Sequence, residues 1–335
     1  MPPLTATRYD VCAIGNAIVD IIAECDDALL AKHKIAKGAM TLVDADRAKF
    51  LYDHTGPGLE MSGGSAANTA AGIASLGGHP AYIGKVSADQ LGDIFRHDMQ
   101  ASGVQFTTAA LTEDLPTARS LILVTPDAQR SMNTFLGACV ELTAADIDPD
   151  MVGLAQITYL EGYLFDKPSA QAAFLLAAQI AHGAKRQVSL TLSDTFCVER
   201  HRPAFLQLVH DEVDILFANE LELLALYPGK DFDAALAQAR QHCSTVVATR
   251  SAAGAVVARG DTVLKIPAEP VAKVVDTTGA GDLFAAGFLF GETHGFDLAT
   301  CGRLGCIAAS EIISHYGPRP QQSLKELARQ KGVKV

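Results

Sequence analysis

The chain has 335 residues, of which 49% are apolar and 19% charged, so it can bury a large core and does not resemble a charge-rich disordered chain. Its formal net charge of −11 argues against a general nucleic-acid-binding protein. The chain shows no long apolar run, so no membrane association is expected. Residues 1–10 show no pattern typical of a secretory signal. Seven cysteines without a C-x-x-C pair predict free thiols in a reducing compartment, the cytoplasm.

In chain order, short β-rich runs alternate with longer helical runs that are rich in alanine and leucine. The predicted strands cover residues 11–15, 81–85, 157–161, 187–192, 215–218 and 245–249. The predicted helices cover residues 66–76, 169–182, 202–211, 232–243 and 283–290. This alternation predicts a single α/β domain over residues 1–335, in which helices cover both faces of a mostly parallel sheet.

Two regions, about residues 18–44 and 105–134, interrupt this alternation. They contain β-like runs at 39–43, 106–111 and 118–124, and the last two have the spacing of a hairpin rather than of a helical crossover. Such runs do not fit easily into a parallel sheet. We therefore predict a small β-sheet that leaves the main domain and folds over it as a lid.

The most informative segment is D-T-T-G-A-G-D at residues 276–282, which precedes an apolar run. Gly279 and Gly281 are expected at the start of a helix, where free N–H groups and the helix dipole attract a phosphate. A carboxylate beside such a site is unfavourable unless it has a function, and Asp282 is well placed to accept a proton from an attacking hydroxyl. The spacing alone also allows Asp282 to be a simple helix cap.

Three motifs together resemble one known family. Residues 276–287, D-T-T-G-A-G-D-L-F-A-A-G, resemble the C-terminal signature of the PfkB/ribokinase family of carbohydrate and nucleoside kinases. Residues 63–70, G-G-S-A-A-N-T-A, resemble its N-terminal signature, and residues 219–222, N-E-L-E, fit its N-x-x-E motif. The resemblance implies a three-layer α/β/α ribokinase-like domain with a lid, which transfers the γ-phosphoryl group of ATP to a hydroxyl.

The resemblance also implies roles for the residues of these motifs. Asp282 would be the catalytic base, and the backbone of Gly279, Ala280 and Gly281 would form the anion hole. Asn219 and Glu222 would organise Mg²⁺ through water, because this ion keeps most of its waters. Taken alone, the same pair favours a helix N-cap with its partner three residues later.

The resemblance implies further contacts with ATP after the predicted strand 245–249 and in the glycine turn, at Thr249, Arg250, Gly254, Thr277 and Thr278. The family usually has glycine where Ser251 stands, so this chain departs from the family pattern next to Arg250, and an ordinary strand-turn is the alternative. The resemblance also makes Asp276 and Thr278, with the loop Ser310–Arg319, candidates for a monovalent cation site, with K⁺ as the candidate ion.

The acceptor site is expected around Asp20, a carboxylate among apolar residues that is costly to bury without a partner. In the family this acid binds sugar hydroxyls, and the residues expected to act with it are Asn16, Gly63, Gly64 and Asn68. Arg130 is expected to neutralise phosphate charge when the lid closes, and Phe135 to pack against the acceptor. A surface arginine and a core phenylalanine are the alternatives.

Asn16, Asp20 and the segment after Arg130 resemble the adenosine kinase branch of the family. We therefore expect a nucleoside as acceptor, phosphorylated on its 5′-hydroxyl. A ribokinase- or fructokinase-like sugar kinase is the main alternative, and a non-catalytic ligand sensor is a more remote one. The expected partners are ATP, Mg²⁺ and a small-molecule acceptor, with no nucleic acid or membrane, in a monomer or a homodimer.

Overall fold

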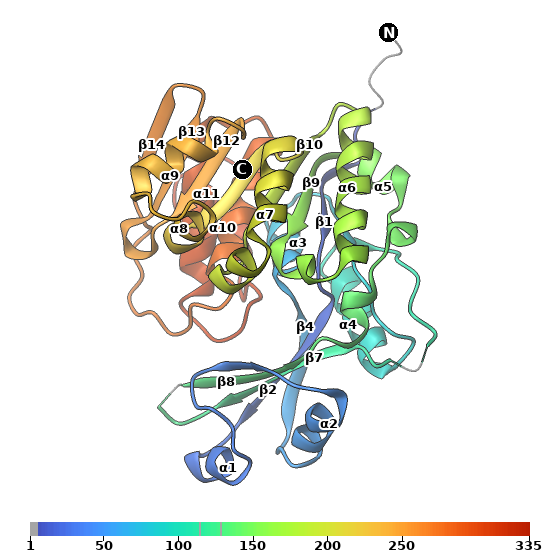
Figure 1. Cartoon of the computed structure of the whole chain (residues 1–335). Coiled ribbons are helices and arrows are strands. Elements are labelled where there is room, and N and C mark those ends of the chain that lie inside the picture. Colours follow the sequence, from blue (N-terminus) through green and yellow to red (C-terminus); the bar gives the residue numbers. More distant parts are fainter. Residues whose placement is uncertain (1–5, 114, 128) are drawn as a thin grey trace.

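The computed structural model describes residues 6–113, 115–127 and 129–335, so the first five residues lie outside it. Figure 1 shows a body made of a central sheet between two layers of helices, with a smaller sheet beneath it. No helix within the described ranges combines the length and hydropathy that a membrane span needs.

The central sheet has nine strands among the described residues. In sheet order they are β14 (Thr262–Ile266), β13 (Ala255–Arg259), β12 (Thr245–Thr249), β11 (Ile215–Asn219), β10 (Gln187–Thr191), β9 (Ala155–Glu161), β1 (Tyr9–Ile14), β5 (Pro80–Ile83) and β6 (Gln105–Phe106). All neighbours from β12 to β6 are parallel, and β13 and β14 add an antiparallel edge. The prediction of a mostly parallel sheet is confirmed.

Helices cover both faces of this sheet. One layer contains α5 (Pro149–Gly153), α6 (Pro168–Gly183), α7 (Thr195–Asp211), α8 (Glu220–Leu226) and α9 (Phe232–Ala239). The other contains α3 (Ser65–Leu76), α4 (Gln90–Ala101), α10 (Ala280–Thr293), α11 (Leu298–Ile312) and α12 (Leu324–Gln330). In β1, Val11 and Ala13 face the second layer while Cys12 and Ile14 face the first. Burial on both faces explains why the strands are continuous apolar runs in the sequence.

The smaller sheet is the lid. Its strands, in sheet order, are β3 (Met40–Leu42), β8 (Arg130–Phe135), β7 (Ala118–Val124), β2 (Ile18–Glu24) and β4 (Gly58–Gly63). Helices α1 (Asp27–Lys32) and α2 (Ala45–Asp53) accompany it (Figure 1). Buried residues of β2 and β7, such as Ile21 and Leu123, join Leu51 of α2 in the same hydrophobic core.

The structure corrects the predicted bounds of the lid. The run at 106–111 does not join it, because Phe106 belongs to β6 at the edge of the central sheet and packs edge-on against Tyr82 and Phe95. The hairpin of the lid joins β7 to β8 instead. The strand β4 was not predicted, so the first lid excursion continues past residue 44 to Gly63. Hairpin spacing alone does not show which sheet buries an aromatic residue.

Close packing of α3 against α10 brings the two signature motifs together. A Cβ atom added at Gly72 of α3 would lie 2.6 Å from Cβ of Ala286 in α10, so only glycine allows this approach. The alanine-rich face of α3 has the same effect, since small side chains let helix axes come close. The first turn of α3 therefore lies against the first turn of α10, where residue 282 stands.

Candidate active site

The carboxylate of Asp282 is held by the neighbouring helix α3. Ser65 Oγ donates a hydrogen bond to Oδ1 at 2.6 Å, and Asn68 Nδ2 donates one to Oδ2 at 2.9 Å. Helix α10 begins at a different residue, Gly279, and shows no side-chain cap. The alternative in which Asp282 merely caps its own helix is therefore wrong.

This environment sets the basicity of Asp282. Burial raises the pKa of its carboxyl group, while the hydrogen bonds from Ser65 and Asn68 and the charge of Arg319 partly lower it. Each carboxylate oxygen keeps a free lone pair. The arrangement gives a fixed carboxylate with a raised affinity for protons, as a general base requires.

The turn before α10 presents backbone donors. Gly279 has a φ angle of 78°, the left-handed region that glycine adopts without strain. Within the described residues, no hydrogen bond is made by the N–H groups of Gly279 and Gly281, and Gly281 is exposed. The N–H of Ala280, expected in the same set, instead donates to the carbonyl of Thr277 at 3.2 Å. The two glycine amides at the positive end of the helix dipole are therefore the donors that this turn offers to an anion.

On the acceptor side, Asn16 follows strand β1 and is buried next to Glu161, the last residue of β9. Asn16 Nδ2 donates to Glu161 Oε1 at 2.8 Å, and the N–H of Ala66 donates to Oε2 at 2.8 Å. The side-chain oxygens of Asn16 and Asn68 are buried without a partner. Two orphaned acceptors near the base indicate that hydroxyl donors of a ligand complete this site.

Asp20 lies on the lid strand β2 and is only 8% exposed. Burial raises the pKa of its carboxyl group to about 7, although the charges of Arg319 and Arg130 act in the opposite direction. Gly63 lies directly against it, since an added Cβ would be 2.4 Å from Asp20 Oδ2. Gly64 begins α3, and a Cβ there would be 2.2 Å from the carbonyl oxygen of Asn16. The predicted acceptor residues thus come together.

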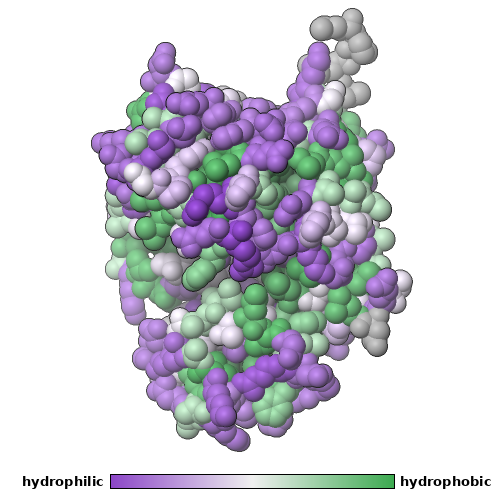
Figure 2. All heavy atoms as spheres, viewed as in Figure 1, coloured by the Kyte–Doolittle hydropathy of each residue, from purple (hydrophilic) through white to green (hydrophobic). Residues whose placement is uncertain are grey.

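The strand register of the lid separates its two faces. One face, which we call the inner face, carries Asp20, Ile22, Leu59, Met61, Ile122, Arg130 and Met132. It turns toward the body, because Ile22 and Met61 lie about 4 Å from the position of a Cβ on Gly317. In Figure 2, hydrophobic residues gather where the lid meets the body.

Phe135 pairs with Arg119 on the opposite face of the lid and is buried. Its expected contact with the acceptor is therefore wrong, and Phe135 is a core residue.

Arg130 reaches from the inner face to the body. Its Nη1 atom forms an ion pair with the carboxylate of Asp276, and both side chains are nearly buried. Its Nε and Nη2 atoms are buried without an acceptor. These two donors form one edge of the guanidinium fork, which matches two oxygens of a phosphate.

On the donor side, Asn219 and Thr249 are register partners at the carboxyl ends of β11 and β12, the edge where parallel sheets bind ligands. Asn219 and Glu222 form a capping box at α8: Asn219 Oδ1 accepts from the N–H of Glu222 at 2.9 Å, and Glu222 Oε2 from the N–H of Asn219 at 2.9 Å. Asn219 Nδ2 also donates to Glu222 Oε1. The alternative interpretation of this pair, a helix N-cap with its partner three residues later, is therefore confirmed.

Residues 47–324 match the model of the pfkB family carbohydrate kinases. This chain belongs to that family. An adenosine kinase from Sinorhizobium meliloti is 55% identical to it, with a TM-score of 0.90 over 97% of this chain and 100% of that one. A probable sugar kinase from Rhizobium etli CFN 42 is 53% identical, with a TM-score of 0.90 over 97% and 99%. The adenosine kinase of Saccharomyces cerevisiae is 29% identical over 331 residues, 91% of this chain and 95% of that one.

The family establishes an ATP-dependent phosphotransferase, and the ribokinase-like fold expected from the motifs is confirmed. In this kinase, Mg²⁺ would neutralise phosphate charge. Asn219 and Glu222 fit such an ion only through its bound waters, because both carboxylate oxygens of Glu222 already accept hydrogen bonds from Asn219. Burial raises the pKa of the Glu222 carboxyl group to about 7, and the negative charges of Asp194 and Asp282 add to the rise. A divalent cation would relieve the repulsion among these carboxylates.

The expected role of Arg250 at ATP disagrees with the structure of this kinase. Its guanidinium donates two hydrogen bonds to Glu220, at 2.9 and 3.0 Å, and lies 4.3 Å from the ring centroid of Phe232. Gly254 also has a packing role, because an added Cβ would lie 2.0 Å from the carbonyl of Ile266. Ser251 has a φ angle of 49°, which explains why other members of the family have glycine there.

Three residues that hydrogen-bond within the candidate site were not predicted to do so: Ser65, Glu161 and Arg319, the last named only as the end of the candidate cation loop. Glu161 carried the same signal as Asp20, a carboxylate at the end of an apolar run, and burial raises its pKa to about 7. Ser65 lies inside the N-terminal signature. Arg319 had no local signal, because its hydrogen bonds go to Ser62 and to the carbonyl of Ala67, more than 250 positions away along the chain.

Proposed function

We propose that this kinase phosphorylates the 5′-hydroxyl of a nucleoside, with adenosine as the first candidate. The observation that carries the proposal is the inner face of the lid. Asp20 supplies a carboxylate that suits the two hydroxyls of a ribose. Around it, Ile22, Leu59, Met61 and Met132 offer an apolar surface. A free pentose carries hydroxyls on most of its carbons and gains little from such a surface, whereas a nucleobase buries a planar apolar face.

In the proposed reaction, Asp282 accepts the proton of the 5′-hydroxyl as its oxygen attacks the γ-phosphorus. A bond forms between this oxygen and phosphorus, the bond between phosphorus and the bridging oxygen breaks, and ADP leaves. The amides of Gly279 and Gly281 and the free edge of Arg130 face the transferring group. Ser65 and Asn68 keep the base aimed at the acceptor throughout.

The names of similar proteins support a nucleoside as the phosphoryl acceptor, and they also keep a sugar as the alternative acceptor. The relatives at 55% and 53% identity carry different names, one an adenosine kinase and the other a probable sugar kinase. Product formation with adenosine, guanosine, ribose and fructose, measured in parallel with ATP and Mg²⁺, distinguishes them. We expect turnover of a nucleoside. Robust turnover of a free sugar without any nucleoside contradicts the proposal, and no turnover of any acceptor favours a sensor.

A matched pair of variants tests the role of the inner face. Met61→Gln keeps the size of the side chain but makes it polar, and Glu60→Gln changes the next residue of β4, on the opposite face. We expect the first variant to raise the KM for the nucleoside about tenfold, roughly the 1.4 kcal/mol of one lost apolar contact. The second should leave KM within about twofold. Equal effects of both variants would contradict an apolar base site.

The cysteines indicate the compartment in which this kinase is expected to work. All seven cysteines are free, which fits a reducing compartment, so we expect the kinase in the cytoplasm. A monomer or a homodimer is expected, and sedimentation of the purified chain decides between them.

A further inference from the structure

Asp276 is the residue at which a monovalent cation was expected, and its carboxylate is surrounded by donors. Oδ1 accepts hydrogen bonds from the N–H of Thr278 at 3.0 Å and from its hydroxyl at 2.8 Å. Oδ2 accepts from the N–H of Gly317 at 3.3 Å and from Arg130 Nη1. Two carboxylate oxygens therefore already have four donors. A potassium ion needs oxygen ligands with free lone pairs, and these atoms do not provide them.

The charge at this position is also already balanced. Arg130 and Asp276 have side chains that are only 10% and 6% exposed, so their ion pair is shielded from water. Arg130 Nη1 also lies 3.4 Å from the hydroxyl of Thr278. A second cation beside this guanidinium would be repelled in a poorly screened environment.

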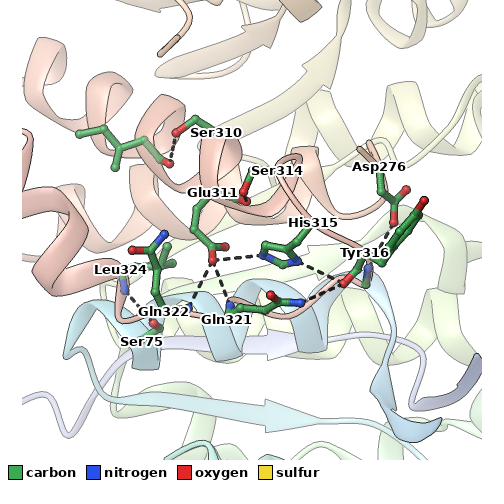
Figure 3. Close-up of polar contacts among 12 residues, drawn as sticks. Ser75, Asp276, Ser310, Glu311, Ser314, His315, Tyr316, Gln321, Gln322 and Leu324 are labelled. Atoms are coloured by element: carbon green, nitrogen blue, oxygen red, sulfur yellow. Dashed lines mark hydrogen bonds and ion pairs between the residues drawn. The ribbon is translucent and has the colours of Figure 1, made fainter. Parts of the chain in front are cut away.

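The loop that follows α11 keeps its shape through its own hydrogen bonds (Figure 3). Glu311 Oε1 accepts from the N–H groups of Gln321 and Gln322 at 3.0 and 3.3 Å, and His315 Nε2 lies 3.1 Å from the same oxygen. Glu311 is almost completely buried. The loop that brings Gly317 to Asp276 is thus ordered by a buried side chain, and it presents a donor rather than an acceptor to the carboxylate.

We infer that the guanidinium of Arg130 takes the place of a monovalent cation beside the anion hole, so that this kinase does not require K⁺. The positive charge that fixes the turn at Asp276 and Thr278 is delivered by the lid strand β8 rather than by an ion. The lid strand β8 and the turn that carries the anion hole are therefore tied to each other by this ion pair. This inference concerns the donor side and does not depend on which acceptor the kinase uses.

The first test compares steady-state rates in tetramethylammonium, sodium and potassium chloride at equal ionic strength, with Mg²⁺ and ATP saturating. The wild type should vary by no more than about twofold. Arg130→Met should be slower in tetramethylammonium, and potassium should restore its rate at least about tenfold, because Asp276 is then left without a counter-charge. Arg119→Met is the matched control, since this arginine lies on the opposite face of the lid beside Tyr52.

Strong activation of the wild type by potassium overturns the inference. So does an Arg130→Met variant that no cation restores, because the guanidinium would then not be a substitute for one. Arg119→Met should behave as the wild type, and a potassium response in this control would also count against a specific role of Arg130.

A second test reads binding without activity. Crystals of the whole chain are soaked in thallium(I) acetate, since thallium(I) scatters anomalously and replaces potassium. We expect no anomalous peak at Asp276 in the wild type and a peak there in Arg130→Met. A wild-type peak at Asp276 overturns the inference. A wild-type peak at Glu311, whose Oε2 is buried without a partner, overturns it as well, because an ion would then order the loop.

Discussion

At the scale of single residues, the site depends on side chains that are held from two directions. Asp282 projects from α10 but is fixed by Ser65 and Asn68 of α3. Asn16 follows β1 but is fixed by Glu161 of β9. Because each reactive or binding group is oriented by a different element, its position depends on the packing of the whole body. A base that is both immobile and partly desolvated combines orientation with raised basicity.

Replacing Asp282 by Asn should lower turnover about a thousandfold, because the amide cannot accept the proton of the acceptor. The shape of the side chain is kept, so we expect the affinity for ATP to remain within about threefold. Single-turnover rates and calorimetric titration with ATP measure the two quantities separately. Ser65→Ala is the milder control, since it removes one orienting hydrogen bond and leaves the base. Turnover of Asp282→Asn at the wild-type rate would refute the assignment.

Arg319 should control the pH dependence of the reaction. Its Nε and Nη2 atoms donate to Ser62, next to the glycine that touches Asp20, and Nη1 donates to Ala67, next to Asn68. Its charge lowers the pKa values of both Asp20 and Asp282, which burial raises. These carboxylates act when deprotonated, so kcat/KM falls as the pH drops through their pKa values.

Without that charge both pKa values rise, and Arg319→Met should therefore lose kcat/KM at a higher pH than the wild type. Profiles of kcat/KM from acidic to neutral pH measure the shift. Arg319→Lys keeps the charge and should keep the wild-type acid limb even if it is less stable. If Arg319→Met is less stable but loses kcat/KM at the same acidic pH as the wild type, Arg319 has only a structural role.

At the scale of elements, the start of α10 combines two glycines with different functions. Gly279 adopts a positive φ angle, and an added Cβ would lie 3.3 Å from Pro318. Gly281 has ordinary helical geometry, and a Cβ there would meet no protein atom within 4 Å. The protein itself therefore explains the first glycine. No packing contact of the described residues requires glycine at position 281, as expected if the proposed phosphate approaches this backbone.

Gly281→Ala and Gly279→Ala should consequently separate stability from activity. Gly281→Ala should leave the melting temperature unchanged or raise stability by up to about 1 kcal/mol, yet lower kcat/KM for ATP at least about tenfold. Gly279→Ala should destabilise the fold by about 1 kcal/mol or more, because alanine is strained at this φ angle. Thermal unfolding and initial rates measure both effects. Normal ATP kinetics in Gly281→Ala would exclude phosphate binding at this amide.

The same elements show how far the sequence predicts the site. Strand and helix alternation predicted the central sheet correctly. The glycine turn and the signature motifs predicted which residues lie around Asp282, because these features depend on local spacing, while the roles of those residues stay predictions. The face of Phe135 and the sheet of Phe106 were predicted wrongly, since both depend on which strand becomes the neighbour. Arg250 was misassigned for a related reason: its partners Glu220 and Phe232 lie on other elements.

At the scale of the whole molecule, polar contacts join the lid to the body. Ser62 of β4 donates its N–H to Asp98 and accepts hydrogen bonds from Arg319. The ion pair of Arg130 with Asp276 and the approach of Ile22 and Met61 to Gly317 form a second link. Several apolar residues of the lid remain largely exposed, among them Leu59 at 61% and Leu42 at 52%. Burying such side chains against an acceptor and the body stabilises a closed state by roughly 25 cal/mol for each Å². The acceptor itself should therefore close the lid.

Amide hydrogen exchange tests this closure directly. Binding of the acceptor should slow exchange in the edge strands β3 and β4, because a closed lid opens less often and excludes water from the site. Helix α6, on the far side of the central sheet, should exchange at the same rate with and without acceptor and serves as the internal control. In Arg130→Met the protection should be weaker at equal acceptor occupancy, since the variant lacks the ion pair that ties the lid to the anion hole. Equal exchange in the lid with and without acceptor would mean that the lid is a fixed wall, and Arg130 would then order the anion hole without any coupling to substrate binding.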